Sequence, residues 1–383
     1  MKKYFFLLFF SLLHNKVMFS QNARFSQIWC APIQFNPALT GRFDGKMRFA
    51  RLISNQTSDR PVYNQVKHQN YSLDIKLGKY RSSGDEKPSG KNVENYISAK
   101  DPALNQFTPN KGYWSIGFNY YHYGSPTSCV DGKFYSGSIA RHFYSLSNRY
   151  YGFGGQMTYA VGKLDASKGL ISNYDIEING GGFTLPRGKY LRDPKAEGSV
   201  NYIDYNGGAY YGLVTDLVMF EVAYSMAHLF YPKNAFKYDS DMPSLRHRTC
   251  ASTILRVRLS NSFGLIQRNI YWKEGMYLKS RNENGDSTQS IAIWSGVEFV
   301  KTNPYRDQNI NFGWYFRSFR TIIPYVSVNI NRALNLRYSY ETTAFNSKKY
   351  TAYTAKRHEL ALILVHKKYS TLGTKFYKKV NLW

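Results

Sequence analysis

The sequence predicts an all-β fold, a transmembrane antiparallel β-barrel of about fourteen strands that follows a cleaved signal peptide. Four observations predict it. Apolar and polar residues alternate with a period of two along the whole chain, and the N-terminus has the composition of an export signal. No later segment approaches the ~18 consecutive apolar residues of a membrane-spanning helix. The aromatic content of 17%, carried mainly by 34 Tyr, suits strands and membrane–water interfaces.

Residues 1–20 are predicted to be the signal peptide. Two lysines directly after the first Met supply the positive start, and the apolar core Tyr4–Leu13 is too short to span a membrane as a helix. Cleavage after Ser20 leaves Gln21 as the new N-terminus. The alternative, that this segment is an apolar first strand, fits the flanking charges less well.

The alternation is clear in the segment from Leu334 to Glu341, where Leu and Tyr residues interleave with Asn, Arg, Ser and Glu. One face of such a strand is apolar and the other is polar. The same criterion predicts strands at 45–55, 66–77, 111–121, 132–144, 150–162, 200–211, 217–229, 247–259, 262–272, 288–300, 308–317, 322–330, 333–343 and 356–366. Most reach the ~9–11 residues that cross a bilayer at a tilt, and the number is even, as in single-chain bacterial barrels.

The lengths of the connections favour a barrel with both ends in the periplasm. Alternate connections should then be short periplasmic turns and longer outer loops. The short ones are 145–149, 212–216, 260–261 and 331–332, and the long ones are 163–199, 230–246, 273–287 and 344–355. Two connections break the rule, because 318–321 is short and 78–110 is long on the sides where the opposite is expected.

The predicted domains follow from these strands. Residues 21–44 form an N-terminal periplasmic segment, which is either a plug or a docking arm. The barrel covers residues 45–366, and a C-terminal tail covers 367–383.

The polar faces of the strands should line the lumen, because charge on the lipid face costs ~2–4 kcal/mol near the middle of the membrane. Water or inward carboxylates such as Glu221 and Glu298 can solvate or pair inward arginines. The candidates that line the lumen are Arg256, Arg258, Arg317, Arg337 and Glu341.

The segment 23–41 carries a Phe-Ser-Gln element followed by Asn-Pro-Ala and a nearby Gly. It resembles the start of the PorP/SprF family of Bacteroidota outer-membrane proteins. The matching positions are Phe25, Ser26, Gln27, Asn36, Pro37, Ala38 and Gly41. All of them except Ala38 are also the candidates for partner docking. Further similar stretches lie at 223–232, at 312–342 and at 358–360. The first strand departs from the family pattern, since Phe49-Ala50-Arg51 lacks the usual Trp.

The resemblance implies an outer-membrane component or accessory of the type IX secretion system. Such a protein supports the secretion or surface attachment of a large exported adhesin and gliding motility. The implied partners are that adhesin and the secretion machinery on the periplasmic side. The net charge of +26 adds attraction to outer-membrane lipid and lipopolysaccharide. The alternative is a passive outer-membrane channel or hydrophobic-solute transporter with an Arg-lined lumen.

Other function classes fit the sequence less well. Ser225 and His228 differ by three positions, so on one strand they point to opposite faces and cannot form a nucleophile–base pair. Three widely spaced cysteines give neither a disulfide framework nor zinc-ligand spacing. Basic residues are scattered rather than gathered in a nucleic-acid-binding stripe. We therefore expect no enzyme activity, no cofactor and no nucleic-acid partner.

Overall fold

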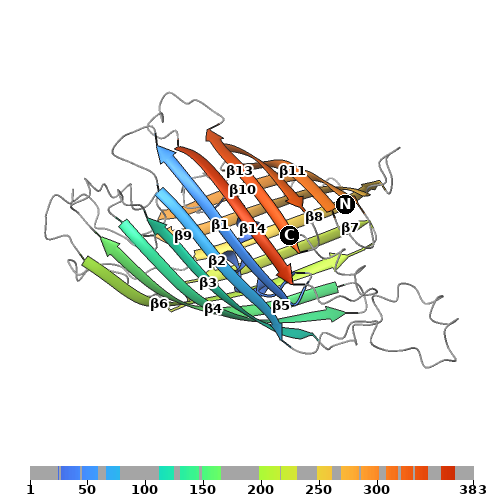
Figure 1. The fold of residues 1–383 in the computed structure, drawn as a ribbon. Coiled ribbons are helices and arrows are strands. Elements are labelled where there is room, and N and C mark those ends of the chain that lie inside the picture. Colours follow the sequence, from blue (N-terminus) through green and yellow to red (C-terminus); the bar gives the residue numbers. More distant parts are fainter. Residues whose placement is uncertain are drawn as a thin grey trace.

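The computed structural model describes residues 25, 27–43, 45–58, 66–77, 112–124, 130–145, 149–164, 198–215, 217–230, 248–260, 269–283, 286–301, 308–317, 321–330, 333–343 and 355–366. These residues form one closed antiparallel barrel in which every strand pairs with its sequence neighbours and β1 pairs with β14 (Figure 1). The strands are β1 (Met47–Ser58), β2 (Val66–Leu77), β3 (Tyr113–Gly124), β4 (Val130–Ser145), β5 (Arg149–Leu164), β6 (Gly198–Val214), β7 (Val218–Ala227), β8 (Arg248–Ser260), β9 (Asn269–Glu283), β10 (Asp286–Lys301), β11 (Gln308–Arg317), β12 (Thr321–Asn329), β13 (Leu334–Thr343) and β14 (Ala355–His366). The predicted fold and strand number are confirmed.

Every predicted strand overlaps an observed one, and the largest error concerns β9. The sequence placed a strand at 262–272 and a long loop at 273–287, whereas β9 continues to Glu283 and pairs there with Asp286 of β10. The loop prediction at 273–287 is wrong, because charged residues of this segment lie on the inner face of a strand and not in a solvent-exposed loop. Lys273 and Lys279 instead point into the barrel, where both side chains are buried. The predicted 260–261 turn and the first part of the predicted strand 262–272 lie largely outside the described residues, which end at Ser260 and resume at Asn269.

The two faces of the wall differ in polarity as the alternation predicts. In β7, Phe220 and Tyr224 are exposed on the outer face, while Glu221 and Ser225 are buried on the inner face. The outer face carries large exposed apolar side chains such as Phe118, which is 56% exposed. Closure of the sheet leaves no unpaired edge at the depth of the hydrocarbon, which lipid requires. Among the described residues, no helix is long and apolar enough to cross a membrane.

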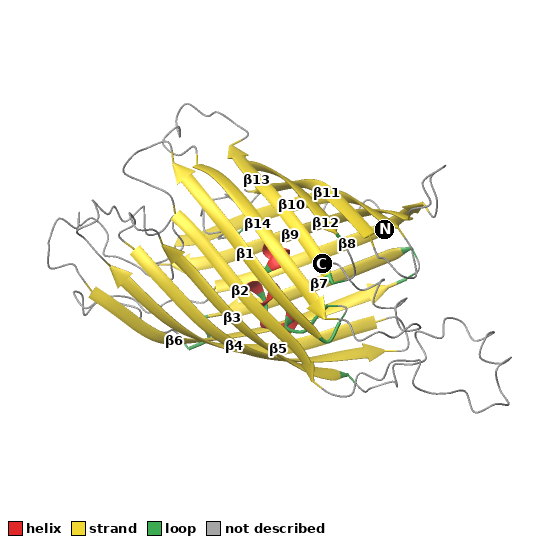
Figure 2. Cartoon of the chain, in the orientation of Figure 1, coloured by secondary structure: helices red, strands yellow, loops and turns green. Residues whose placement is uncertain are grey.

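An N-terminal plug lies inside the barrel. It comprises the described residues 25 and 27–43, with the short helices η1 (Ile28–Cys30), α2 (Pro32–Phe35) and η2 (Pro37–Leu39), which Figure 2 shows within the ring of strands. Prolines near the start of α2 and η2 fix φ where a helix N-terminus needs it. The sequence placed residues 21–44 in the periplasm, whereas the structure places the described part of this segment in the lumen.

The plug runs lengthwise through the lumen. Phe25 packs on Tyr121, near the end of β3, with ring centroids 5.7 Å apart. At the other end of the plug, Thr40 accepts a hydrogen bond from Ser115, near the start of β3. Six residues of strand, roughly 20 Å, separate the two contact points. The predicted signal peptide, the segment 78–110 and the predicted tail 367–383 lie outside the described residues.

Candidate functional site: the plug and its contacts with the wall

Asn36 fastens the middle of the plug to two strands. Its Nδ2 donates to the carbonyl oxygens of Ala209 in β6 and Tyr224 in β7, each at 3.2 Å. Its Oδ1 accepts a hydrogen bond from the backbone N–H of Ala38 at 2.9 Å and thereby caps η2. One buried side chain thus orders the plug and ties it to the wall.

The wall carries glycine where the plug backbone comes closest. A Cβ on Gly154 would lie 2.6 Å from the carbonyl oxygen of Pro37, and one on Gly208 would lie 2.1 Å from Oδ1 of Asn36. A Cβ on Gly117 would lie 2.7 Å from the methyl group of Thr40. We call Gly117, Gly154 and Gly208 the glycine surface. It explains why the Asn-Pro-Ala segment can approach the strands so closely.

A charged contact holds the last residues of the plug. Arg42 forms a buried ion pair with Glu221 of β7, and Tyr150 of β5 donates to the same carboxylate at 2.9 Å. The guanidinium carbon of Arg42 lies 5.1 Å from the ring centroid of Tyr150 and 4.8 Å from that of Tyr210. The cation is therefore both paired and stacked, which burial of a charge requires.

Thr40 is held by three side chains of the wall. Its carbonyl oxygen accepts from Ser115 Oγ at 2.6 Å and lies 2.7 Å from His142 Nε2. Its hydroxyl donates to Ser138 Oγ at 2.8 Å. Directly after it, Gly41 adopts φ +72°, a conformation that favours glycine, and a Cβ there would lie 2.3 Å from Ser115 Cβ.

The first described residues of the plug contact the opposite end of the lumen. The backbone N–H of Gln27 donates to Glu359 of β14 at 3.0 Å, and its Nε2 donates to Ser339 of β13 at 2.9 Å. Cys30 donates to Oε1 of Gln27 at 3.3 Å, and burial raises the pKa of the Cys30 thiol to about 11. Phe25 is completely buried.

Of the docking candidates predicted from the sequence, all but Ser26 fall within the described residues. Phe25, Gln27, Asn36, Pro37 and Gly41 are all buried between plug and wall. Their direct contacts are therefore with this chain itself. Ser26 lies outside the described residues.

The lumen-lining candidates also lie on the inner face, and two of them pair with carboxylates. Arg256 lies 2.9 Å from Glu298, which also contacts Lys273 at 3.0 Å. Arg317 donates to Glu341 at 2.9 Å.

Two further arginines contact uncharged groups. Arg337 Nε donates to Asn335 Oδ1 at 2.8 Å. The guanidinium carbon of Arg258 lies 5.9 Å from the ring centroid of Tyr271. Glu221, expected to pair with an arginine of the lumen wall, instead binds Arg42 of the plug.

Sequence reasoning missed the wall residues that hold the plug, above all Tyr150, His142 and the glycine surface. A usable signal was present in the runs Gly152–Gly155 and Asn206–Gly208, since glycines in adjacent strands indicate close approach by another backbone. Trp29 of the plug and Trp294 of β10 meet inside the lumen with ring centroids 5.9 Å apart.

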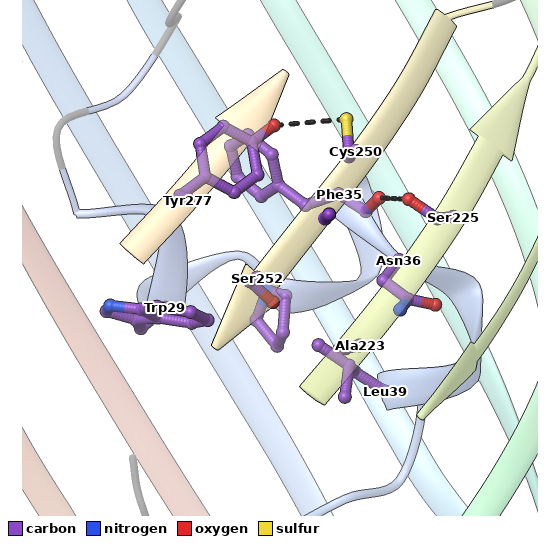
Figure 3. A pocket seen from close by; sticks show the side chains of 11 residues that line it. Trp29, Phe35, Asn36, Leu39, Ala223, Ser225, Cys250, Ser252 and Tyr277 are labelled. Atoms are coloured by element: carbon purple, nitrogen blue, oxygen red, sulfur yellow. Dashed lines mark hydrogen bonds between the residues drawn. The ribbon is translucent and has the colours of Figure 1, made fainter. Parts of the chain in front are cut away.

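A small gap remains between the plug and strands β7, β8 and β9 (Figure 3). Its volume is about 10 Å³, which is room for about one water molecule. Ser225 in its lining donates to the carbonyl oxygen of Phe35 at 2.6 Å, and Tyr277 donates to Cys250 at 3.2 Å. The hydroxyl of Ser225 is thus engaged in holding the plug. No group of three or more metal-ligating side chains occurs in the described part of the chain.

Comparison with known proteins places this architecture. The family model described as type IX secretion system membrane protein PorP/SprF matches residues 17–364. No curated protein sequence matches the chain. Among solved structures, the Ralstonia pickettii toluene transporter TbuX is similar with 9% identity and a TM-score of 0.47, over 88% of this chain and 93% of that one. The Neisseria meningitidis translocator domain of autotransporter NalP is similar with 11% identity and a TM-score of 0.36, over 84% and 88%. At such identities the likeness concerns the barrel fold only.

The match to the family model covers the plug and every strand except the last two residues of β14. The chain therefore belongs to the PorP/SprF family of type IX secretion system membrane proteins and is an outer-membrane β-barrel.

Proposed function

We propose that this barrel is a docking component or accessory of the type IX secretion system, which supports the secretion or surface attachment of an exported adhesin and gliding motility. The observation that carries the proposal is the plug, which the wall holds inside the lumen. The plug is bonded to the wall from Gln27 to Arg42, and the gap between it and β7, β8 and β9 has room for only about one water molecule.

A lumen occupied by a bonded plug favours docking at the rims over passage through the barrel. An exported protein is available at the outer rim, and the secretion machinery is available at the periplasmic rim. The excess of basic residues suits contact with anionic lipid and lipopolysaccharide. We infer that the protein acts by binding rather than by catalysis, because the hydroxyl of Ser225, near His228, donates its hydrogen bond to the plug backbone.

Deletion of the gene tests the proposal. Surface proteins released from intact cells by protease are quantified in the deletion strain, in the wild type and in the deletion strain carrying the gene on a plasmid. We expect at least one large exported protein to disappear from the surface and to return on complementation. An unchanged surface proteome contradicts the proposed function.

A further inference from the structure

Strand β6 extends well beyond its neighbour β7. β6 has 17 residues and pairs with β5 along almost its whole length, out to Gly198 opposite Leu164. β7 has 10 residues and pairs only with Gly207–Val214 of β6. The part of β6 from 198 to 206 therefore has β5 on one side and no described strand on the other.

The hydrogen-bonding groups on that open side can be identified. Leu229 donates its backbone N–H to the carbonyl oxygen of Tyr205 at 3.0 Å, so Tyr205 directs its backbone groups toward β7. Residues of one strand alternate in the side to which they direct these groups. The N–H and C=O groups of Ser199, Asn201 and Ile203 therefore face the open side, which we call the free edge of β6. Within the described residues they have no backbone partner there.

A turn after β7 ends its ladder with β6. His228, directly after β7, has φ +62°, which few non-glycine residues adopt. Residues 229 and 230 form a turn instead of continuing the strand.

The free edge lies at the outer rim. β1 starts on the periplasmic side in barrels of this class, and β6 runs in the opposite direction, so its first residues are outermost. The ten residues of β7 suffice to cross a bilayer. Unpaired backbone groups cannot lie in hydrocarbon, so residues 198–206 of β6 stand outside it.

Side chains beside the edge offer an apolar contact. Ile203 is 51% exposed and Tyr205 is 39% exposed, both on the outer face. Phe230 is 74% exposed and packs edge to face on Tyr205, with centroids 5.3 Å apart. A strand added here would gain backbone hydrogen bonds and could place an apolar side chain against this group.

We propose that the free edge of β6 binds an extended segment of the exported partner, which pairs with it as an added β-strand. The identity of this partner rests on the proposed function. Backbone pairing supplies the affinity in this mode, and alternate side chains supply the specificity. An apolar residue of the partner would lie beside Ile203 and Tyr205.

A second copy of the chain does not fit the edge. Barrel strands tilt by about 35–45°, so two copies inserted in the same direction would cross their β6 strands at roughly twice that angle. Ladder pairing needs strands that are nearly aligned. A flexible segment of an exported protein has no such constraint.

The test compares Ile203→Pro with Ile203→Ala in the complemented deletion strain. Proline removes the open N–H without removing a bond to β5, whereas alanine removes only the side chain. The probe is the surface protein that the deletion removes. With Ile203→Pro its surface amount should fall about tenfold, and with Ile203→Ala it should stay within about twofold of the wild type. Heat-modifiable gel mobility checks that each barrel is folded.

Amide hydrogen exchange on the wild-type protein gives a measurement that needs no variant. In the purified protein without partner, the open amides of 199–203 should exchange rapidly, and addition of the purified surface protein should slow them. Slow exchange without partner would mean that another part of this chain covers the edge, and the proposal would be overturned. Full surface display with Ile203→Pro overturns it as well. If the deletion itself changes no surface protein, the proposed function fails as well. If the deletion removes a surface protein that Ile203→Pro still displays, only the binding at the free edge fails. The two failures are therefore distinguishable.

Discussion

Arg42 of the plug and Glu221 of β7 form an ion pair inside the barrel, with only 4% and 2% of their side chains exposed. Removal of one partner leaves a buried charge, which costs about 3–5 kcal/mol. We expect Arg42→Met to lower the free energy of unfolding by that order, and Arg42→Met/Glu221→Leu to lower it by less than the sum of the single changes. Urea unfolding in detergent measures the cycle. Additive effects would show that the two side chains do not interact.

Cys30 should be a sensitive reporter of the plug's position. It is 2% exposed, and burial raises its pKa from 9.0 to about 11, so the thiolate fraction near pH 8 falls about a hundredfold. A variant that keeps Cys30 and carries Ser at 129 and 250 should react with a maleimide at least that much more slowly when folded than in urea. Equal rates would mean that the plug leaves the lumen freely.

Gly154→Ala should loosen the plug. The new Cβ would lie 2.6 Å from the backbone of Pro37, and such overpacking costs about 1–3 kcal/mol. The rate of Cys30 alkylation should rise accordingly. Gly137→Ala is the matched control, because a Cβ there meets nothing within 4 Å. The same rate in both variants would rule out contact between the plug and β5.

Asn36→Asp should separate the two roles of this side chain. Aspartate keeps the oxygen that caps Ala38 but replaces the donor that binds the carbonyl oxygens of Ala209 and Tyr224. A carboxylate oxygen would then face the two carbonyl oxygens with no donor between them. This should destabilise the bound position of the plug by at least about 1–3 kcal/mol and speed Cys30 alkylation. If Asn36→Asp behaves like the wild type, the cap alone matters.

The wild-type barrel should be silent in a planar lipid bilayer. The plug leaves a gap of only about 10 Å³ beside β7, β8 and β9. A variant without residues 25–43 should conduct, and the arginines of the inner face should favour anions. Steady conductance of the wild type would favour the channel alternative.

The wall could be predicted from the sequence because its signal is local. Each strand carries its own alternation, and lipid on one side and a polar interior on the other enforce it. The extent of β9 was not predicted, because its inward residues include the charged Lys273 and Lys279. The neighbouring pair Asn284-Gly285 could have corrected this prediction, since Asn-Gly is typical of a two-residue hairpin loop with a strand on each side.

The plug's position could not be predicted in the same way. Its contacts join residues far apart in the chain, such as Gln27 with Glu359 and Asn36 with Ala209. No local pattern encodes such pairs. The resemblance identified Asn36 and Pro37 as important, but only the packing against Gly154 and Gly208 gives the physical reason.

The pairing of β1 with β14, twelve residues long from Met47 opposite His366 to Ser58 opposite Ala355, sets an order for assembly. Gln27, which precedes every strand of the barrel in the sequence, finds its acceptor Glu359 only on β14. The N-terminal segment must therefore wait until the whole wall is present, and the final seam closes around it. A chain that lacks β14 loses both the strand that closes the barrel and Glu359, the acceptor that holds the start of the plug.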